Sequence, residues 1–124
     1  MFPIGITCYA HFDGTSTYSV WTEWAPAPPV FYNSTNFHAG DVVHARVVAH
    51  SESSGTTYLE NMSTGERLET SYSNQTFTLS LTDVEWVVES QLQLTVLGPQ
   101  GLLGARYTPW VFEDAVYRTK GKLD

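Results

Sequence analysis

Residues 18–26 read YSVWTEWAP, and this stretch predicts a β-strand that is ended by a proline. With the period of two that a strand imposes, one face carries Tyr18, Val20, Thr22 and Trp24, and the other carries Ser19, Trp21 and Glu23. A carboxylate therefore shares a face with an indole. This pairing favours a concave surface that holds a ligand. The alternative is a half-buried strand whose exposed face carries these side chains by chance.

Strand patterns continue outward from this stretch in both directions. Residues 41–50, DVVHARVVAH, alternate most clearly between apolar and other side chains. Residues 30–40, which lie between this strand and the strand of 18–26, indicate a connecting loop. Further strands are predicted at 4–12, 56–62, 67–71, 75–81, 84–89, 92–97, 103–107 and 111–117. Turns are predicted at 13–17, 51–55, 63–65, Gly98-Pro99 and Gly101. The sequence therefore predicts an all-β fold, a single antiparallel two-sheet β-sandwich over residues 1–117 with a polar tail at 118–124.

Composition is consistent with one folded domain and excludes several classes of function. Of the 124 residues, 42% are hydrophobic and 14% are aromatic, which argues against a disordered chain. The formal net charge of -7 opposes binding to a phosphate backbone, so we expect no nucleic-acid partner. No apolar run approaches the length that spans a bilayer, so we expect no membrane partner. The opening residues do not read as a signal peptide.

Cysteine and histidine usage predicts neither a disulfide framework nor a metal site. Cys8 is the only cysteine, and the four histidines are scattered without the spacing of metal ligands. We therefore expect no cofactor and no bound metal. Three tripeptides that begin at Asn33, Asn61 and Asn74 match the acceptor pattern for N-linked glycans, and each lies in or at the edge of a segment that connects predicted strands. They favour a secreted lineage with possible glycans at these positions.

Residues 84–89, VEWVVE, supply the second candidate site residue. Glu89 ends an otherwise apolar run, where burial and a nearby carboxylate would raise its pKa, as acid–base catalysis requires. Glu23 is the candidate for that second carboxylate. The alternative is that Glu89 is a polar residue at a strand end.

Four stretches together resemble a known family in their order along the chain. YSVWTEWAP, AGDVVHARVVA, YLENMSTGERLE and TDVEWVVES are similar to consecutive motifs of the eqolisins, which are secreted acid glutamic endopeptidases. The resemblance covers about residues 16–117 and suggests an N-terminally truncated or degenerate member that lacks some N-terminal strands.

The resemblance implies a fold and a set of site residues. The family fold is a concanavalin A-like jelly roll, similar to lectins and glucanases, with the active site on its concave face. By position, Glu89 matches the catalytic glutamate, and Trp21, Glu23 and Tyr18 match residues of the substrate cleft. The implied activity is hydrolysis of polypeptides at acid pH by a glutamate general base and an activated water, in a secreted monomer without a cofactor.

This sequence also departs from the family pattern. The family uses a glutamine amide to stabilise the oxyanion, and counting back without a gap places that position at or near Thr7. Ser19 stands where the family often has an aspartate. We therefore expect an impaired peptidase.

A noncatalytic module is the alternative prediction. In a lectin-like sandwich, tryptophan side chains can form platforms that bind a sugar or a peptide. The candidates are Trp21, Trp24, Trp86 and Trp110.

Overall fold

The computed structural model describes residues 1–33, 35–88, 92–95, 98–101 and 111–119. Its strands are β1 (Ile4–Ala10), β2 (Ser16–Thr22), β3 (Val30–Phe31), β4 (Val43–Ser51), β5 (Ser54–Asn61), β6 (Arg67–Tyr72), β7 (Leu92–Thr95) and β8 (Gly98–Gly101). The described residues contain strands and no helix, so none of their segments is a helix that could span a membrane. The all-β prediction is confirmed.

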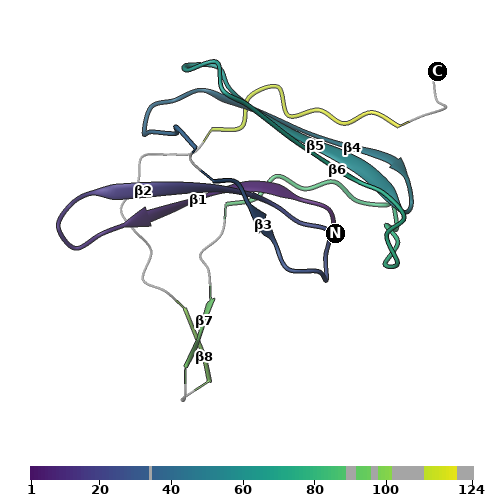
Figure 1. Ribbon diagram of the computed structural model, residues 1–124, viewed down its shortest axis with the longest axis horizontal. Coiled ribbons are helices and arrows are strands. Elements are labelled where there is room, and N and C mark those ends of the chain that lie inside the picture. Colours follow the sequence, from purple (N-terminus) through teal and green to yellow (C-terminus); the bar gives the residue numbers. More distant parts are fainter. Residues whose placement is uncertain (34, 89–91, 96–97, 102–110, 120–124) are drawn as a thin grey trace. The chain divides into compact units, whose positions relative to one another are not determined.

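The chain divides into two compact units, Met1–Leu81 and Thr82–Asp124. The first unit holds two three-stranded antiparallel sheets, with strand orders β1-β2-β3 and β4-β5-β6. The second unit contains the antiparallel pair β7 and β8, drawn in green in Figure 1.

The β1–β2 hairpin forms because its turn residues suit a tight reversal. Gly14 has a φ of 87°, a conformation that glycine adopts without steric cost. The Asp13 carboxylate accepts hydrogen bonds from the backbone N–H and the hydroxyl of Thr15, at 2.9 and 2.6 Å. This turn fixes a register in which Thr7 lies opposite Ser19 and Gly5 lies opposite Trp21.

The two sheets of the first unit lie as two layers, purple and teal in Figure 1, around a small core. Val20 of β2, Leu59 of β5 and Phe37 form the buried cluster between them. A hydrogen bond of 2.9 Å also joins the buried hydroxyls of Thr22 and Thr57 across the layers. The face of β2 that was predicted to lie inside is therefore the inner face.

An aromatic group closes one end of this core. Trp24 is almost completely buried, with its ring centroid 4.7 Å from that of Phe2 and 5.8 Å from that of Tyr72. Its indole N–H donates to the carbonyl oxygen of Phe77 at 2.7 Å. Trp24 is therefore a core residue, and the prediction that it forms a binding platform is wrong.

Several predicted element boundaries need correction. The predicted loop 30–40 contains strand β3, whose Phe31 pairs with Trp21. Gly98–Gly101 is a strand and not a pair of turns. Residues 75–81, 84–88 and 111–117 alternate or are apolar in sequence, but they form no strand. Residues 103–107 lie outside the described part of the chain.

The predicted strands that do not form lack a partner for a hydrogen-bonded ladder within the described residues. Residues 75–81 instead make isolated bonds, from the N–H of Gln75 to Ser53 and from the N–H of Leu79 to Glu52. Leu81 then has a φ of 56°, which interrupts an extended backbone. Alternation predicts which way side chains point, but a strand also needs a neighbouring backbone.

Candidate functional site

The candidate site is the outer face of the sheet formed by β1, β2 and β3. Alternation along β2 turns Ser19, Trp21 and Glu23 away from the core, as the sequence predicts. The antiparallel register adds Thr7 beside Ser19 on the same face. This face thus combines two hydroxyls, an indole and a carboxylate.

Trp21 lies across the neighbouring strand. Its indole Nε1–H donates a hydrogen bond to Oγ1 of Thr7 at 3.0 Å. The ring also covers Gly5, where an added Cβ would meet the ring atom Cζ2 at 2.4 Å and Cε2 at 2.7 Å. The indole can therefore take its observed position only because residue 5 is a glycine.

Phe31 of β3 lies on the other side of Trp21. The two residues are directly paired, so their side chains share the outer face, and Phe31 remains 49% exposed. Trp21 and Phe31 together give this part of the face an apolar surface in contact with solvent.

The Ser19 hydroxyl is an unusual feature of the same face. Its oxygen is shielded from solvent and makes no hydrogen bond to any residue that the structure describes. Buried polar groups without a partner are uncommon in folded proteins and are often found where a ligand or water completes the site.

Glu23 follows the end of β2 and is partly buried. Its backbone N–H donates to the carbonyl oxygen of Pro3 at 3.1 Å, which continues the pairing beyond Thr22. Its carboxylate makes no hydrogen bond or ion pair with the described residues, so it is available to an added group. Glu89 lies outside the described residues, and its pairing with Glu23 stays a prediction.

Tyr18 lies on the opposite face of β2 from Trp21 and Glu23. It is packed against the cluster of Val20, Phe37 and Leu59. Burial raises the pKa of Tyr18, and the side chain of Cys8 on the paired strand raises it further. The structure thus brings Trp21 and Glu23 together and separates Tyr18 from them.

The donor set of the site suits a polar organic ligand. Within the described ranges, no group of three or more His, Cys, Asp or Glu side chains could hold a metal ion. Hydroxyls and an indole beside a carboxylate can hydrogen-bond to peptide groups, and Trp21 with Phe31 can contact apolar side chains.

The family model described as the peptidase A4 family matches residues 1–124. The chain belongs to the peptidase A4 family. The recognition of eqolisin motifs in the sequence is thereby confirmed.

This chain is also similar in sequence and in structure to individual glutamic peptidases. The chain is 34% identical over 77 residues to scytalidopepsin B of Scytalidium lignicola, covering 61% of this chain and 30% of that protein. It is 35% identical over 83 residues to aspergillopepsin-2 of Aspergillus niger, covering 66% of this chain and 29% of that protein. The crystal structure of aspergilloglutamic peptidase from Aspergillus niger matches with a TM-score of 0.67 and 31% identity, over 73% of this chain and 53% of that chain.

These matches define what kind of A4-family domain this is. It is a glutamic peptidase-type domain with the all-β fold of the family. The chain spans about 30% of the length of these two curated relatives and about half of the solved chain.

Two residues of the candidate site were missed in the sequence. Gly5 and Phe31 flank Trp21, and neither stands in a pattern that singles it out. Counting outward from the turn at Asp13-Gly14 would have paired Gly5 with Trp21, because a hairpin turn sets the register of both strands. Phe31 stands in a short segment that follows several prolines, and no alternation marks it as a strand.

Proposed function

We propose that this chain is a glutamic-type endopeptidase domain that hydrolyses peptide bonds of polypeptides at acid pH. The observation that carries the proposal is the family match over residues 1–124. Glu89 is the proposed general base. It takes a proton from a water molecule that attacks the scissile carbonyl, and it then returns a proton to the leaving amide nitrogen.

The outer face of β1, β2 and β3 is the proposed substrate surface. The indole of Trp21 and the ring of Phe31 contact substrate side chains, and the Glu23 carboxylate contacts polar groups of the peptide. The Glu23 carboxylate, which is unpaired among the described residues, and the exposure of Phe31 support these roles. Tyr18 supports the strand from its inner face, because it is packed against the core.

The proposed weakness of the site is its oxyanion donor. The hydroxyl of Thr7 accepts the Trp21 N–H. Thr7 stands at or near the position that the family resemblance gives to the glutamine amide. A hydroxyl has a shorter reach than a glutamine amide. Loss of one oxyanion donor slows acyl transfer by roughly a hundredfold to a thousandfold, so we expect low activity.

The test is hydrolysis of denatured casein at acid pH by the purified chain, with pepstatin present to suppress contaminating aspartic peptidases. We expect slow cleavage by the wild-type chain and none by Glu89→Gln, which keeps the size of the side chain and removes the base. Cleavage that persists in the variant would show that Glu89 is not the base.

A second variant tests the oxyanion donor. Thr7→Gln restores an amide at this position, and we expect it to raise the rate of casein cleavage by up to roughly a hundredfold over wild type. Thr7→Val, which has nearly the same size as threonine but no hydroxyl, is the matched control and should abolish the slow activity. Equal rates for the three proteins would remove Thr7 from the mechanism.

We also propose that the protein is secreted and monomeric. The acceptor tripeptides at Asn33, Asn61 and Asn74 support secretion. If the folded chain cleaves nothing, the alternative is a noncatalytic sandwich that binds a peptide or a sugar on the Trp21 and Phe31 surface. Direct titration with a nonhydrolysed peptide would then measure that binding.

A further inference from the structure

Two of the acceptor tripeptides for N-linked glycans have opposite environments in the structure. We propose that Asn74 is a glycan attachment site and that Asn61, although it also matches the acceptor pattern, remains unmodified in the folded protein. The proposal rests on the secretion that is part of the proposed function, and it is independent of peptidase activity. Asn33 carries no prediction, because its tripeptide includes Ser34, which lies outside the described residues.

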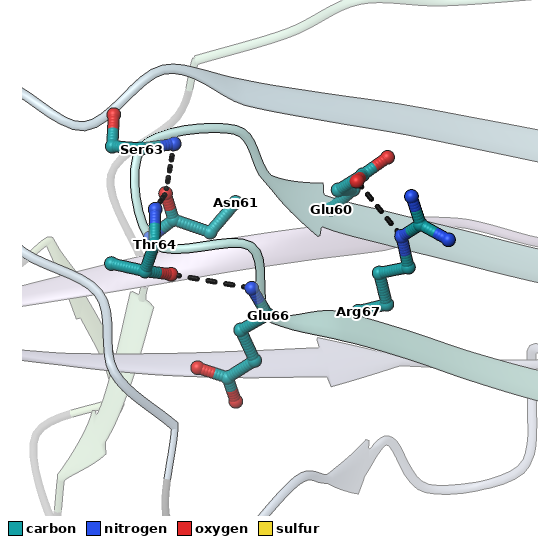
Figure 2. A network of polar contacts seen from close by, with 6 residues as sticks. All are labelled: Glu60, Asn61, Ser63, Thr64, Glu66 and Arg67. Atoms are coloured by element: carbon teal, nitrogen blue, oxygen red, sulfur yellow. Dashed lines mark hydrogen bonds and ion pairs between the residues drawn. The ribbon is translucent and has the colours of Figure 1, made fainter.

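The Asn61 side chain is fully buried at the end of β5, and its oxygen holds the next turn in place. Figure 2 shows Oδ1 accepting hydrogen bonds from the backbone N–H groups of Ser63 and Thr64, at 3.0 and 3.2 Å. Both donors belong to the turn that connects β5 to β6. The asparagine oxygen therefore takes the place of a backbone acceptor in this turn.

The nitrogen of the same amide is equally occupied. Nδ2 donates to the backbone oxygen of Asn36 at 3.1 Å and to Oδ2 of Asp41 at 2.7 Å. An amide nitrogen carries two hydrogens, and both are used here. Attachment of a sugar replaces one of them, so at least one of these bonds is lost.

Ser63, the third residue of this tripeptide, is also engaged. Its hydroxyl oxygen accepts the backbone N–H of Val42 at 3.0 Å. A sugar on Asn61 would thus have to occupy a position that has no exposed surface and is enclosed by the segments of Asn36, Asp41 and Ser63. Burying a bulky polar group in such a place leaves its hydroxyls without water, so the glycan and the fold exclude each other.

Asn74 presents the contrasting case just after β6. Its side chain is exposed, as is that of Thr76, the third residue of its tripeptide. Its amide makes no hydrogen bond to a residue in the described part of the chain. Asn74 has a φ of 53°, a backbone conformation that asparagine adopts more readily than most residues.

The backbone around Asn74 is nevertheless anchored. The N–H of Gln75 donates to the carbonyl oxygen of Ser53 at 3.0 Å, and the Gln75 side chain donates to the carbonyl oxygen of Ser73 at 3.0 Å. These bonds use no atom of the Asn74 side chain. A glycan can therefore be attached there without loss of any contact that holds the fold.

The modification is a transfer from an isoprenoid diphosphate-linked oligosaccharide, the donor class used in the secretory pathway. The Asn74 amide nitrogen forms a bond to C1 of the first sugar and loses one proton. The bond between C1 and the diphosphate oxygen breaks, and the diphosphate leaves with the electron pair. No oxidant or reductant is needed.

The test uses the full chain, produced in yeast behind a cleavable secretion signal. The folded secreted protein is treated with peptide N-glycosidase in heavy-oxygen water, which converts each glycosylated asparagine to labelled aspartate, and the peptides are mapped by mass spectrometry. We expect label at position 74 and none at position 61. Label at position 61 in folded protein, or an unlabelled position 74, would overturn the proposal.

A matched pair of variants controls for the acceptor pattern. Thr76→Ala destroys the tripeptide but leaves Asn74 in place, and we expect it to lose one glycan by mass. Thr76→Ser keeps the pattern and should retain that glycan. If Thr76→Ala keeps the same glycan mass as wild type, Asn74 is not the site.

A second measurement covers chains that are retained inside the cell. The microsomal pool is treated with protease, and the resistant, folded fraction and the degraded fraction are mapped separately. We expect any label at position 61 to be confined to the degraded fraction. Label at position 61 in the resistant fraction contradicts the incompatibility of glycan and fold.

Discussion

At the residue scale, the position of Trp21 depends on the absence of a side chain on the neighbouring strand. The indole covers Gly5 and reaches Thr7, which it could not do above a residue with a Cβ. The glycine therefore shapes the proposed substrate surface without itself contacting a substrate. It determines where the largest aromatic side chain of the site lies.

Gly5→Ala tests this dependence. The added methyl would meet the Trp21 ring at less than contact distance, so we expect a destabilisation of about 1–3 kcal/mol and a shift of tryptophan fluorescence as the indole moves. Urea unfolding measures the first effect and emission spectra measure the second.

Trp21→Ala provides the control for this prediction. Without the ring there is no clash, so Gly5→Ala should cost much less in the Trp21→Ala background than in wild type. An equal cost in both backgrounds would show that the glycine is needed for another reason.

At the scale of elements, residues 73–81 are held by separate contacts and not by a ladder. The carbonyl oxygen of Phe77 accepts the Trp24 indole N–H, and the N–H groups of Gln75 and Leu79 bond to the turn between β4 and β5. The Trp24 bond ties this segment directly to the aromatic group in the core. We infer that the indole keeps the segment against the sheet.

Trp24→Phe should remove this attachment and retain much of the aromatic packing. We expect a loss of about 1 kcal/mol, because a partly buried hydrogen bond is removed. Hydrogen exchange at the N–H groups of Gln75 and Leu79 should become faster. Phe77→Ala is the matched control, because it keeps the carbonyl and removes an exposed side chain. Equal exchange rates in both variants would contradict the role of the indole.

Some of the strands could be predicted from the sequence alone, and others could not. Alternation in 18–24 correctly separated Val20 from Trp21, and the turn predicted at Asp13-Gly14 lies between β1 and β2. Alternation failed in 75–81 because the backbone partner of a strand is not encoded in its own side chains. The bond between Trp21 and Thr7 was equally out of reach, because it depends on the hairpin register.

The candidate site was predicted only in part. Trp21 and Glu23 share a face as their spacing of two requires, whereas Tyr18 has odd spacing from both and lies on the other side. Glu89 was singled out at the end of an apolar run and given its catalytic role by the family resemblance, and it lies outside the described residues. The Ser19 hydroxyl has no partner among the described residues, which is a property of packing that no sequence pattern signals.

At the scale of the whole molecule, the proposed activity requires a fold that survives at acid pH. The chain carries 13 acidic and six basic side chains, so protonation of its carboxylates leaves few like charges to repel one another. Individual carboxylates still matter where the fold uses their negative charge. Asp41 accepts hydrogen bonds from Asn61 and from the backbone N–H of His38, and these bonds hold its pKa below the ordinary value of 3.8.

The stability of the whole fold should therefore depend on pH through Asp41. Its folded-state pKa lies below its unfolded pKa, so its contribution is present above about pH 3.8 and is lost as the pH falls through the lower folded value. We expect thermal unfolding temperatures to decline in that window. Asp41→Asn keeps an acceptor oxygen and should show a shallower decline. An identical pH profile for variant and wild type would exclude this role.

The hydroxyl pairs between the two sheets of the first unit also have a mechanical consequence. The hydroxyl of Thr22 forms a hydrogen bond with that of Thr57, and the hydroxyl of Tyr32 forms one with that of Thr70. The two layers are therefore joined by hydroxyl pairs at two separate points. Apolar contacts alone let one layer slide over the other with little loss, because burial has no direction. Hydrogen bonds have a preferred direction, and two of them resist both translation and rotation. The interior of this protein therefore resists shear between its layers, although its apolar core is small.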